Sequence, residues 1–221
     1  MRKVVQLFAV VGVLASVPLQ AQARAGQGWS VLTGETVGHN ATAVHVQAGW
    51  PGISATLLHG YTPNVDFGGI FTFNYGVEGD VNNVHPELKL QGLAKATLLD
   101  TPKYNLGVWF APGPLLAFYP STPFFGSTTT FGIAFASGLI FGLPVTNLVN
   151  VAFNFDLPMF VTFGDFGSFT VPILFGGGVE YFIEKNMALT FNLRMGPIIY
   201  TKSGFGTNFD LMALFGLAFK L

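Results

Sequence analysis

The chain ends with "FDLMALFGLAFKL", residues 209–221, and this stretch decides the fold. Every second residue in it is apolar: Phe209, Leu211, Ala213, Phe215, Leu217, Phe219 and Leu221. The residues between them are mixed and include Asp210 and Lys220. Successive side chains of a β-strand point to opposite faces, so this period of two predicts a strand with one wholly apolar face.

The composition of the chain indicates what that apolar face contacts. Only 10% of the 221 residues are charged, 15% are aromatic and 28 are glycine. A soluble domain usually has about 25% charged residues, so a water-facing surface built from this chain would be poor in charge, and we expect the protein to face lipid. The chain has no cysteine, which excludes a disulfide framework and a thiolate metal site.

The first residues have the form of a targeting signal. Arg2 and Lys3 precede an almost wholly apolar run over residues 4–17, and "AQA" at residues 21–23 has the small-x-small form of a signal-peptidase site. The run is short for a membrane helix of about 20 residues, so we predict a signal peptide over residues 1–23 that is cleaved near Ala23. Without it, acidic residues outnumber basic ones, which argues against a nucleic-acid partner.

The residue pattern in the middle of the chain favours membrane-spanning strands over helices. In lipid, only helices and closed barrels satisfy every backbone polar group. The best helix candidate, residues 131–145, contains Pro144 and three glycines, and its bulky residues recur with a period of two. The same alternation recurs in residues 149–157, 171–181 and 189–195. This pattern is typical of a barrel wall, where outward and inward positions alternate.

Short turn signals alternate with longer loops along the chain, as in bacterial outer-membrane barrels. Counting back from the C-terminus, we predict strands near residues 207–221, 187–201, 168–183, 147–162, 129–143, 104–118, 85–99, 65–77, 53–60 and 41–49. The last two require Pro51-Gly52 to divide one apolar stretch. If it only kinks a long strand, residues 29–37 supply the tenth strand, and a barrel of eight strands is a further alternative. Residues 24–40 are therefore a periplasmic segment or an extra strand.

The signal peptide, the sorted strands and the C-terminal stripe together resemble the bacterial outer-membrane β-barrel class over residues 41–221. The resemblance implies an all-β, transmembrane, antiparallel up-and-down barrel in the outer membrane. It also implies that the barrel-assembly machinery recognises the terminal strand, through Phe215, Leu217, Phe219 and Leu221. The class usually ends in Phe, and this chain departs from it by ending in Leu221.

Strand parity predicts which charged side chains point into the lumen or its mouths. They are Glu87, Lys89, Lys95, Asp156, Glu180, Arg194, Asp210 and Lys220. Buried charges need partners, and barrels of this size have interiors roughly filled by side chains, which favours structural ion pairs. The alternative is a charged constriction in a narrow pore. We expect a diagonal contact of Glu180 with Arg194, with Asp210 as a further partner.

Two other features suggest function less directly. The outer loops are aromatic and nearly uncharged, and Phe124, Phe125 and Phe166 are candidates for hydrophobic contact with a ligand or partner. His45 and His59 are candidates for facing each other across a hairpin, while His85 is the one histidine expected near the outer-loop serines that a lipid-modifying enzyme needs. Neither set has the spacing of a known site, so we predict no catalytic residue, no metal and no cofactor.

The sequence therefore predicts an integral outer-membrane barrel that is not an enzyme. Its expected role is that of a narrow porin-like passive channel or a structural membrane protein. The first alternative is a module that binds a hydrophobic ligand or envelope partner through the Phe-rich outer loops, and the second is a lipid-modifying barrel enzyme. The expected partners are the lipid bilayer, the assembly machinery during insertion, and a small solute or hydrophobic ligand.

Overall fold

The computed structural model describes residues 26–76, 86–119, 128–164, 167–201 and 205–221. The predicted signal peptide, the three loop phenylalanines Phe124, Phe125 and Phe166, and His85 lie outside the described residues. The described residues form eleven strands: β1 (Thr42–Trp50), β2 (Gly52–Thr62), β3 (Val65–Asn74), β4 (Glu87–Asp100), β5 (Asn105–Tyr119), β6 (Thr128–Pro144), β7 (Val149–Thr162), β8 (Ser168–Pro172), β9 (Leu174–Glu184), β10 (Met187–Thr201) and β11 (Phe205–Lys220). Within the described residues, no helix is long and apolar enough to cross a membrane.

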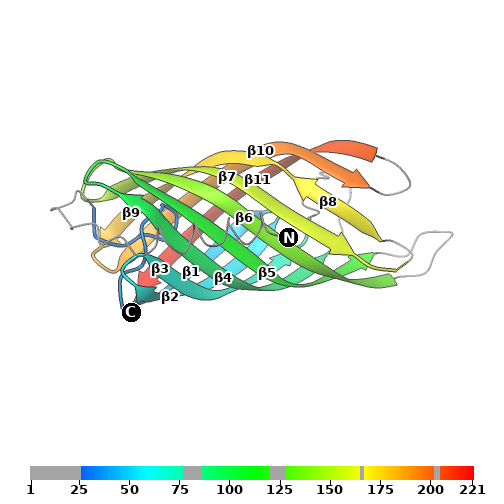
Figure 1. Cartoon of the computed structure of the whole chain (residues 1–221), viewed down its shortest axis with the longest axis horizontal. Helices are drawn as coiled ribbons and strands as arrows, with labels where there is room; N and C mark the ends of the chain where they lie inside the picture. Colours follow the sequence, from blue (N-terminus) through cyan, green and yellow to red (C-terminus); the bar gives the residue numbers. More distant parts are fainter. Residues whose placement is uncertain (1–25, 77–85, 120–127, 165–166, 202–204) are drawn as a thin grey trace, which may run out of the picture.

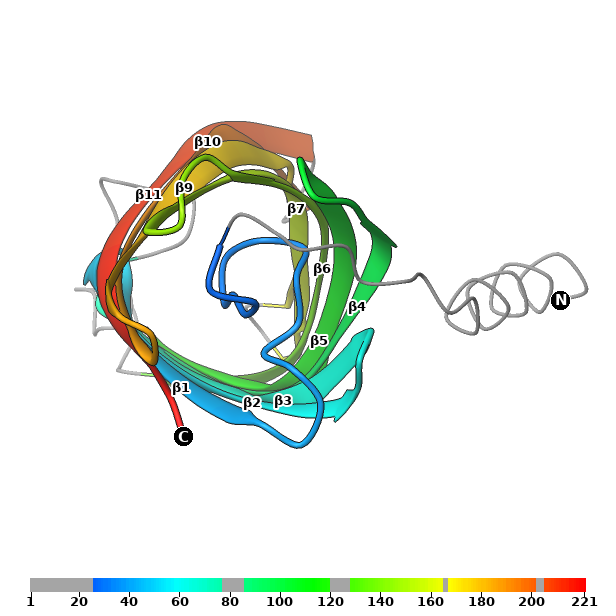
Figure 2. The same cartoon turned by 90° about the vertical axis from the view of Figure 1, so that its left-hand side faces the viewer.

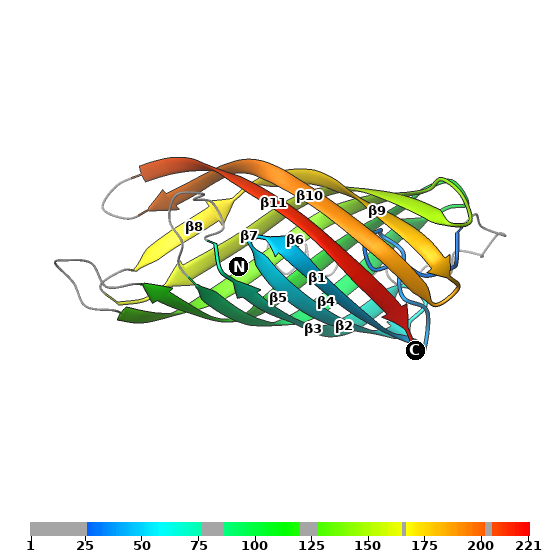
Figure 3. The ribbon, with the colours of Figure 1, turned by 180° about the vertical axis from the view of Figure 1, so that it is seen from behind.

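The strands close into an antiparallel barrel (Figures 1 and 3). Closure is made by β1 and β11, which pair from Ala43 with Lys220 to Trp50 with Ala213. β8 and β9 occupy a single place in the wall, because both pair with β7 on one side and β10 on the other. They separate after Pro172, which has no N–H for the ladder. The wall thus has ten positions, which confirms the predicted fold class.

Pro51 separates β1 from β2, as one of the two sequence interpretations required. The two strands pair from Thr42 with His59 to Ala48 with Ile53. Residues 29–37 form no strand of the wall, so the interpretation in which they supply the tenth strand is wrong, as is the eight-stranded alternative. The physical reason is that a proline at a strand end, followed by a glycine, allows a sharp reversal instead of a kink.

The two ends of the barrel differ. One end, which we call the turn end, carries the short connections β2–β3, β4–β5, β6–β7 and β9–β10 together with the C-terminal Leu221 (Figure 1). The other end, which we call the loop end, carries the long β3–β4 and β5–β6 connections, the β7–β8 and β10–β11 connections, and the tight β1–β2 turn. In bacterial outer-membrane barrels the short turns face the periplasm and the longer loops face outward.

The outer face of the barrel is apolar over its whole circumference. Large exposed side chains occur on every long strand and include Leu57, Phe67, Leu90, Phe110, Leu139, Phe153, Phe175, Leu189 and Phe215. Alternate residues point inward and include most of the buried charged and amide side chains. A closed wall with lipid-compatible residues outside and polar ones inside is the arrangement that a bilayer requires. The chain is an outer-membrane-type β-barrel.

Most of residues 26–40 lies inside the barrel near its turn end, where Figure 2 shows the inner part of the blue trace surrounded by the wall. We call these residues the plug. The plug has little regular structure, but Trp29, Ser30, Thr33 and Val37 are each at most 1% exposed. The middle of the plug, residues 29–37, therefore fills the lumen and is not part of the wall, whereas Gly28, His39 and Asn40 are exposed.

Candidate functional site

Apolar packing seats the plug against the inner wall. The Trp29 ring meets Phe182 of β9 edge-on, with 5.3 Å between ring centroids, and its indole N–H donates to the carbonyl oxygen of Lys185 at 2.8 Å. On the other side of the plug, Gly34 touches Gly107 of β5. A Cβ on Gly34 would come within 2.5 Å of the Gly107 nitrogen, so this close backbone approach requires glycine.

Glu180 of β9 is the main polar anchor of the plug and is fully buried. Its Oε2 accepts hydrogen bonds from the Ser30 hydroxyl at 2.6 Å and from the Asn150 amide at 3.2 Å. Its Oε1 accepts from the backbone N–H groups of Val31 at 2.9 Å and Leu32 at 3.4 Å. A buried carboxylate with several donors has the partners that its desolvation requires.

Two further charged wall residues bind the backbone of the plug. Lys95 of β4 donates to the carbonyl oxygens of Ser30 at 2.9 Å and Glu35 at 2.5 Å. Asp66 of β3 accepts from the Val37 N–H at 3.1 Å and 3.2 Å through its two oxygens. The sequence analysis expected the inward charges to form ion pairs, whereas Glu180, Lys95 and Asp66 all bond backbone groups of the irregular plug.

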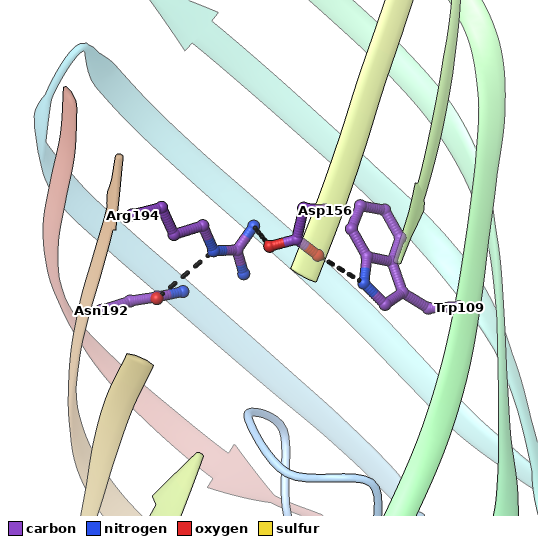
Figure 4. Close-up of polar contacts among 4 residues, drawn as sticks. All are labelled: Trp109, Asp156, Asn192 and Arg194. Atoms are coloured by element: carbon purple, nitrogen blue, oxygen red, sulfur yellow. Dashed lines mark hydrogen bonds and ion pairs between the residues drawn. The ribbon is translucent and has the colours of Figure 1, made fainter. Parts of the chain in front are cut away.

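A second network crosses the lumen farther toward the loop end (Figure 4). Asp156 of β7 accepts a hydrogen bond from the indole N–H of Trp109 at 3.0 Å. Its other oxygen lies 3.1 Å from Nη1 of Arg194 on β10, and Arg194 also donates to the Asn192 side chain at 3.3 Å. The Asp156 side chain is 1% exposed and that of Arg194 is 21% exposed, so the pair is mostly removed from bulk water.

This network corrects the expected contact of Arg194 with Glu180. Arg194 lies opposite Gly176 of β9, whereas Glu180 lies opposite Thr190. Four residues along a strand correspond to about 13 Å, which is beyond the reach of a diagonal contact. Gly176 instead leaves space above β9 for the Arg194 side chain, because a Cβ there would lie 2.9 Å from Arg194 Cγ.

A cavity of about 180 Å³ lies between the plug and the loop end. Val31 and Leu32 of the plug contribute to its lining, together with Trp109, Asp156 and Arg194 of the crossing network. The plug thus turns what would be a continuous lumen into a pocket. A cavity of about 150 Å³ is enough for a molecule the size of benzene, so this one has room for a small ligand group.

One wall of the cavity carries a row of polar side chains on four consecutive strands. Gln47 pairs with Ser54, Ser54 with Thr72, and Thr72 with Lys89, and all four line the cavity. Residues directly opposite each other have Cβ atoms about 5 Å apart, so the row is continuous. The Gln47 side chain is 8% exposed, and its Nε2 has no hydrogen-bond partner among the described residues. We call these four residues the polar row.

The opposite side of the cavity is mostly apolar, apart from Asp156 of β7 and its partner Arg194. Its lining comes mainly from β5, β6, β7 and β9 and includes Trp109, Ala134, Ala136, Ile140, Phe160 and Leu174. The small side chains of Ala134 and Ala136 leave the space that larger residues would fill. A ligand in the cavity would therefore meet hydrogen-bonding groups on one side and hydrocarbon on the other.

The remaining sequence candidates are distributed over the barrel. Glu87 and Lys89 form an ion pair at 3.4 Å, Asp210 is buried in β11, and half-buried Lys220 lies 6.0 Å from the Trp29 ring centre. The proposed assembly residues Phe215, Leu217, Phe219 and Leu221 lie on the closing strand or just after it, and Phe215, Phe219 and Leu221 are exposed.

The histidines do not form the pair that the sequence suggested. His45 lies opposite Thr56 and His59 opposite Thr42. The ring of His45 is buried and its Nε2 contacts the Thr190 hydroxyl at 2.8 Å, while His59 Nδ1 contacts the Thr42 hydroxyl at 3.0 Å. Since each ring bonds a different threonine on a different part of the wall, they do not act on one ligand.

Sequence reasoning missed several residues that build the site. The sequence predicts a periplasmic segment or an extra wall strand over residues 24–40, and this prediction gives no role to Ser30 or Glu35. It also does not single out Asp66 or Gln47. A signal was present: residues 26–40 are rich in glycine and hydroxyl side chains, which suit an irregular backbone in a polar lumen. Parity along β1 and β3 also places Gln47 and Asp66 inward.

Comparisons with known proteins add the following. No family model and no curated protein matches the chain. Among solved structures, the barrel is similar to that of the outer membrane protease OmpT from Escherichia coli, with 10% sequence identity, coverage of 89% of this chain and 100% of that chain, and a TM-score of 0.45. At this identity the likeness assigns no activity to this chain.

The same comparison corrects one prediction. The sequence led us to predict that the protein is not an enzyme. The outer-membrane structure that it resembles is a protease, which overturns that prediction, because the barrel architecture gives no ground for excluding catalysis.

Proposed function

We propose that this protein binds a small amphipathic molecule inside the outer-membrane barrel. The observation that carries the proposal is the cavity of about 180 Å³ between the plug and the loop end. It has the features of a ligand site: it is concave, mostly lined by apolar side chains, and equipped with a few converging polar groups. The sequence suggested, as an alternative, a module that binds a ligand through its outer loops. The binding site proposed here lies in the lumen instead.

The plug favours binding over the narrow passive channel that the sequence led us to expect. It fills the turn end through Trp29, Gly34 and Val37 and is held by three buried charged residues of the wall, Glu180, Lys95 and Asp66. Each bond to a charged group contributes about 1.5–3 kcal/mol. A segment with this many bonds is built to stay in place while solute occupies the cavity.

The polar row supports a ligand with one hydrogen-bonding end. The amide N–H groups of Gln47, the hydroxyls of Ser54 and Thr72, and the ammonium of Lys89 are all donors. Lys89 is already paired with Glu87, so the row has little net charge. Carboxylate, ester and alcohol groups all accept from such donors, while the apolar lining on the other side suits a hydrocarbon tail.

The test uses Trp109 as a reporter within the cavity lining. A variant with Trp29→Phe and Trp50→Phe leaves Trp109 as the single tryptophan of the three in the chain. The protein, reconstituted in phosphatidylcholine vesicles, is titrated with 8-bromooctanoic acid or 8-bromooctan-1-ol, since bromine quenches tryptophan on contact. We expect saturable quenching that unbrominated octanoate reverses.

Two variants control for nonspecific partition of the probe into the bilayer. Ala136→Phe fills the cavity and should abolish the saturable quenching. Ala55→Phe adds the same side chain on the lipid face of β2, between inward-facing Ser54 and Thr56, and should leave the quenching unchanged. Quenching that rises linearly with probe, or that is equal in the two variants, would refute a lumen binding site. A planar-bilayer current through the intact protein would favour the channel instead.

A further inference from the structure

Beside the cavity, some strands of the barrel wall end earlier than their neighbours. β1 ends at Trp50, opposite Ala213 of β11. β11 continues toward the loop end over residues 205–212, and among the described strands only β10 pairs with that part. At about 3.3 Å per residue, these eight residues leave an edge about 26 Å long with no described strand beside it.

The neighbouring strands end at the same level as β1. Gly52 of β2 pairs with Asn74, the last residue of β3, and Asn74 pairs with Glu87, the first residue of β4. Figure 3 shows β1 and β2 ending well short of the β10–β11 hairpin. The low part of the wall therefore extends over several strands, next to the projecting half of β11.

The cavity extends to this low part of the wall. Its lining includes Pro51, Gly52 and Ile53 from the β1–β2 hairpin and Met212 from β11. Ile53 is 46% exposed and belongs to the outward face of β2. Ile53 therefore lies both at the margin of the cavity and on the outer face of the wall, next to the β1–β2 hairpin.

Aromatic residues indicate the depth of this gap in the bilayer. The rings of Trp50 and Tyr75 meet edge-on at the rim, with 6.1 Å between centroids, and the Tyr75 hydroxyl donates to the Gly49 carbonyl oxygen. Tryptophan and tyrosine gather where acyl chains meet head groups. On the β11 side, Phe209 and Leu211 are exposed, so the gap has an interfacial rim on one side and an apolar one on the other.

We propose that the gap between the β1–β2 hairpin and residues 205–212 of β11 is a lateral portal that joins the cavity to the outer leaflet. This inference rests on the proposed function. Its ligand is a single-chain amphiphile, whose polar end binds the polar row at Gln47 and whose tail lies toward Met212 and the lipid. A cavity of about 180 Å³ encloses little more than a benzene-sized group, so the rest of an acyl tail passes through the portal.

The edge of β11 is compatible with passage of an amphiphile through the portal. Along an antiparallel edge, alternate residues turn their N–H and C=O groups away from the paired strand. An unsatisfied backbone group in hydrocarbon costs several kcal/mol, so a gap bordered by such groups requires polar material at the interface. Water, lipid head groups and the polar end of an amphiphile all meet this requirement, and a purely hydrocarbon ligand does not.

The experiment obstructs the portal and measures the rate of entry. The chain has no cysteine, so Leu211→Cys, an exposed position on the β11 side of the portal that does not line the cavity, is introduced in the Trp109-only background and labelled with a maleimide-linked polyethylene glycol before reconstitution. The control carries the same label at Leu139→Cys, an exposed outward position on β6, away from β1, β2 and β11. Proteoliposomes are mixed in a stopped-flow instrument with phosphatidylcholine vesicles preloaded with 8-bromooctanoic acid, and quenching of Trp109 reports entry of the probe.

The portal predicts that the label at residue 211 slows quenching about tenfold or more, within the range over which association rates vary among variants. The label at residue 139 should change nothing, and the final quenching should be equal in both proteins. Equal rates for the two labelled proteins would overturn the portal and place entry at the loop end. Loss of the final quenching with the label at 211 alone would also overturn it, since that position would then belong to the binding site.

Two further results test the binding site and the β11 edge separately. If unlabelled protein shows no saturable quenching, the proposed function fails, whatever the rates of the labelled proteins. If a Leu211→Cys variant forms disulfide-linked dimers in vesicles, a second copy covers the β11 edge, and the portal is overturned while the binding site stands.

Discussion

The Glu180 carboxylate accepts a 2.6 Å hydrogen bond from the hydroxyl of Ser30, a residue 150 positions earlier in the chain. This contact joins the plug to the barrel wall at a point with no exposure to solvent. Because Glu180 also accepts from the Val31 N–H, one side chain orders consecutive residues of a segment without regular structure. The cavity lies on the other side of that segment, so this contact also helps to define its floor.

Replacement of Glu180 should loosen the plug. Glu180→Ala removes the acceptor for Ser30 and Val31 and should lower the free energy of unfolding in detergent by at least about 1.5–3 kcal/mol, the value of one hydrogen bond to a charged group. In a Leu32→Cys background, maleimide labelling should become faster. Glu184→Gln, on an exposed residue of the same strand, is the control; equal labelling in the two variants would show that Glu180 does not hold the plug.

The partner of Arg194 can be tested by a double-mutant cycle. Arg194→Met leaves the Asp156 carboxylate buried without its cation, and breaking a buried pair costs about 3–5 kcal/mol. Because Arg194 is partly exposed, we expect a loss of stability at the lower end of this range. Adding Asp156→Asn should recover part of the stability, whereas adding Glu180→Gln should not. Recovery with Glu180→Gln alone would mean that Arg194 pairs as the sequence suggested.

The close contact of Gly34 with Gly107 predicts a steric effect at a position without a side chain. Gly34→Ala places a Cβ 2.5 Å from a backbone nitrogen, and overpacking of this kind costs about 1–3 kcal/mol. Gly92→Ala is the control, because a Cβ there meets no atom within 4 Å. Chemical denaturation in detergent measures both, and a neutral Gly34→Ala would place the plug differently in the lumen.

Deleting residues 26–37 should convert the pocket into a continuous lumen. The acidic and basic groups that hold the plug, Glu180, Asp66 and Lys95, would then face water. We expect stepwise ion currents in planar bilayers from the deletion variant and little or no current from the intact protein. Equal currents from both proteins would mean that the plug does not close the turn end.

The closing strand should tolerate no charge on its outward face. Phe219 lies opposite Val44 of β1 and Met187 of β10, and a charge on the lipid face of a barrel costs up to about 2–4 kcal/mol, less near an interface. Phe219→Asp should reduce the heat-modifiable barrel recovered from membranes, and Phe219→Leu should not. Normal recovery of the Asp variant would contradict the predicted role of the C-terminal stripe in assembly.

The sequence by itself determined the wall. The alternation of Phe209 to Leu221 is a local property, since each side chain takes the face opposite to its neighbour whatever the rest of the chain does. Low charge then assigned the apolar face to lipid, and turn residues such as Pro51 marked the strand ends. The same parity placed Glu180, Arg194 and Asp156 on the inner face, as the structure has them.

Only the tertiary structure decided what those inward groups bind. Partner choice depends on the registers of several strands at once: Arg194 reaches Asp156 over Gly176, while Glu180 lies about 13 Å away along β9. The plug has no periodicity to read, because its backbone groups are satisfied by side chains from the wall and not by a ladder. Those partners, from Asp66 to Glu180, surround residues 26–40 only after β1 pairs with β11 and the barrel closes.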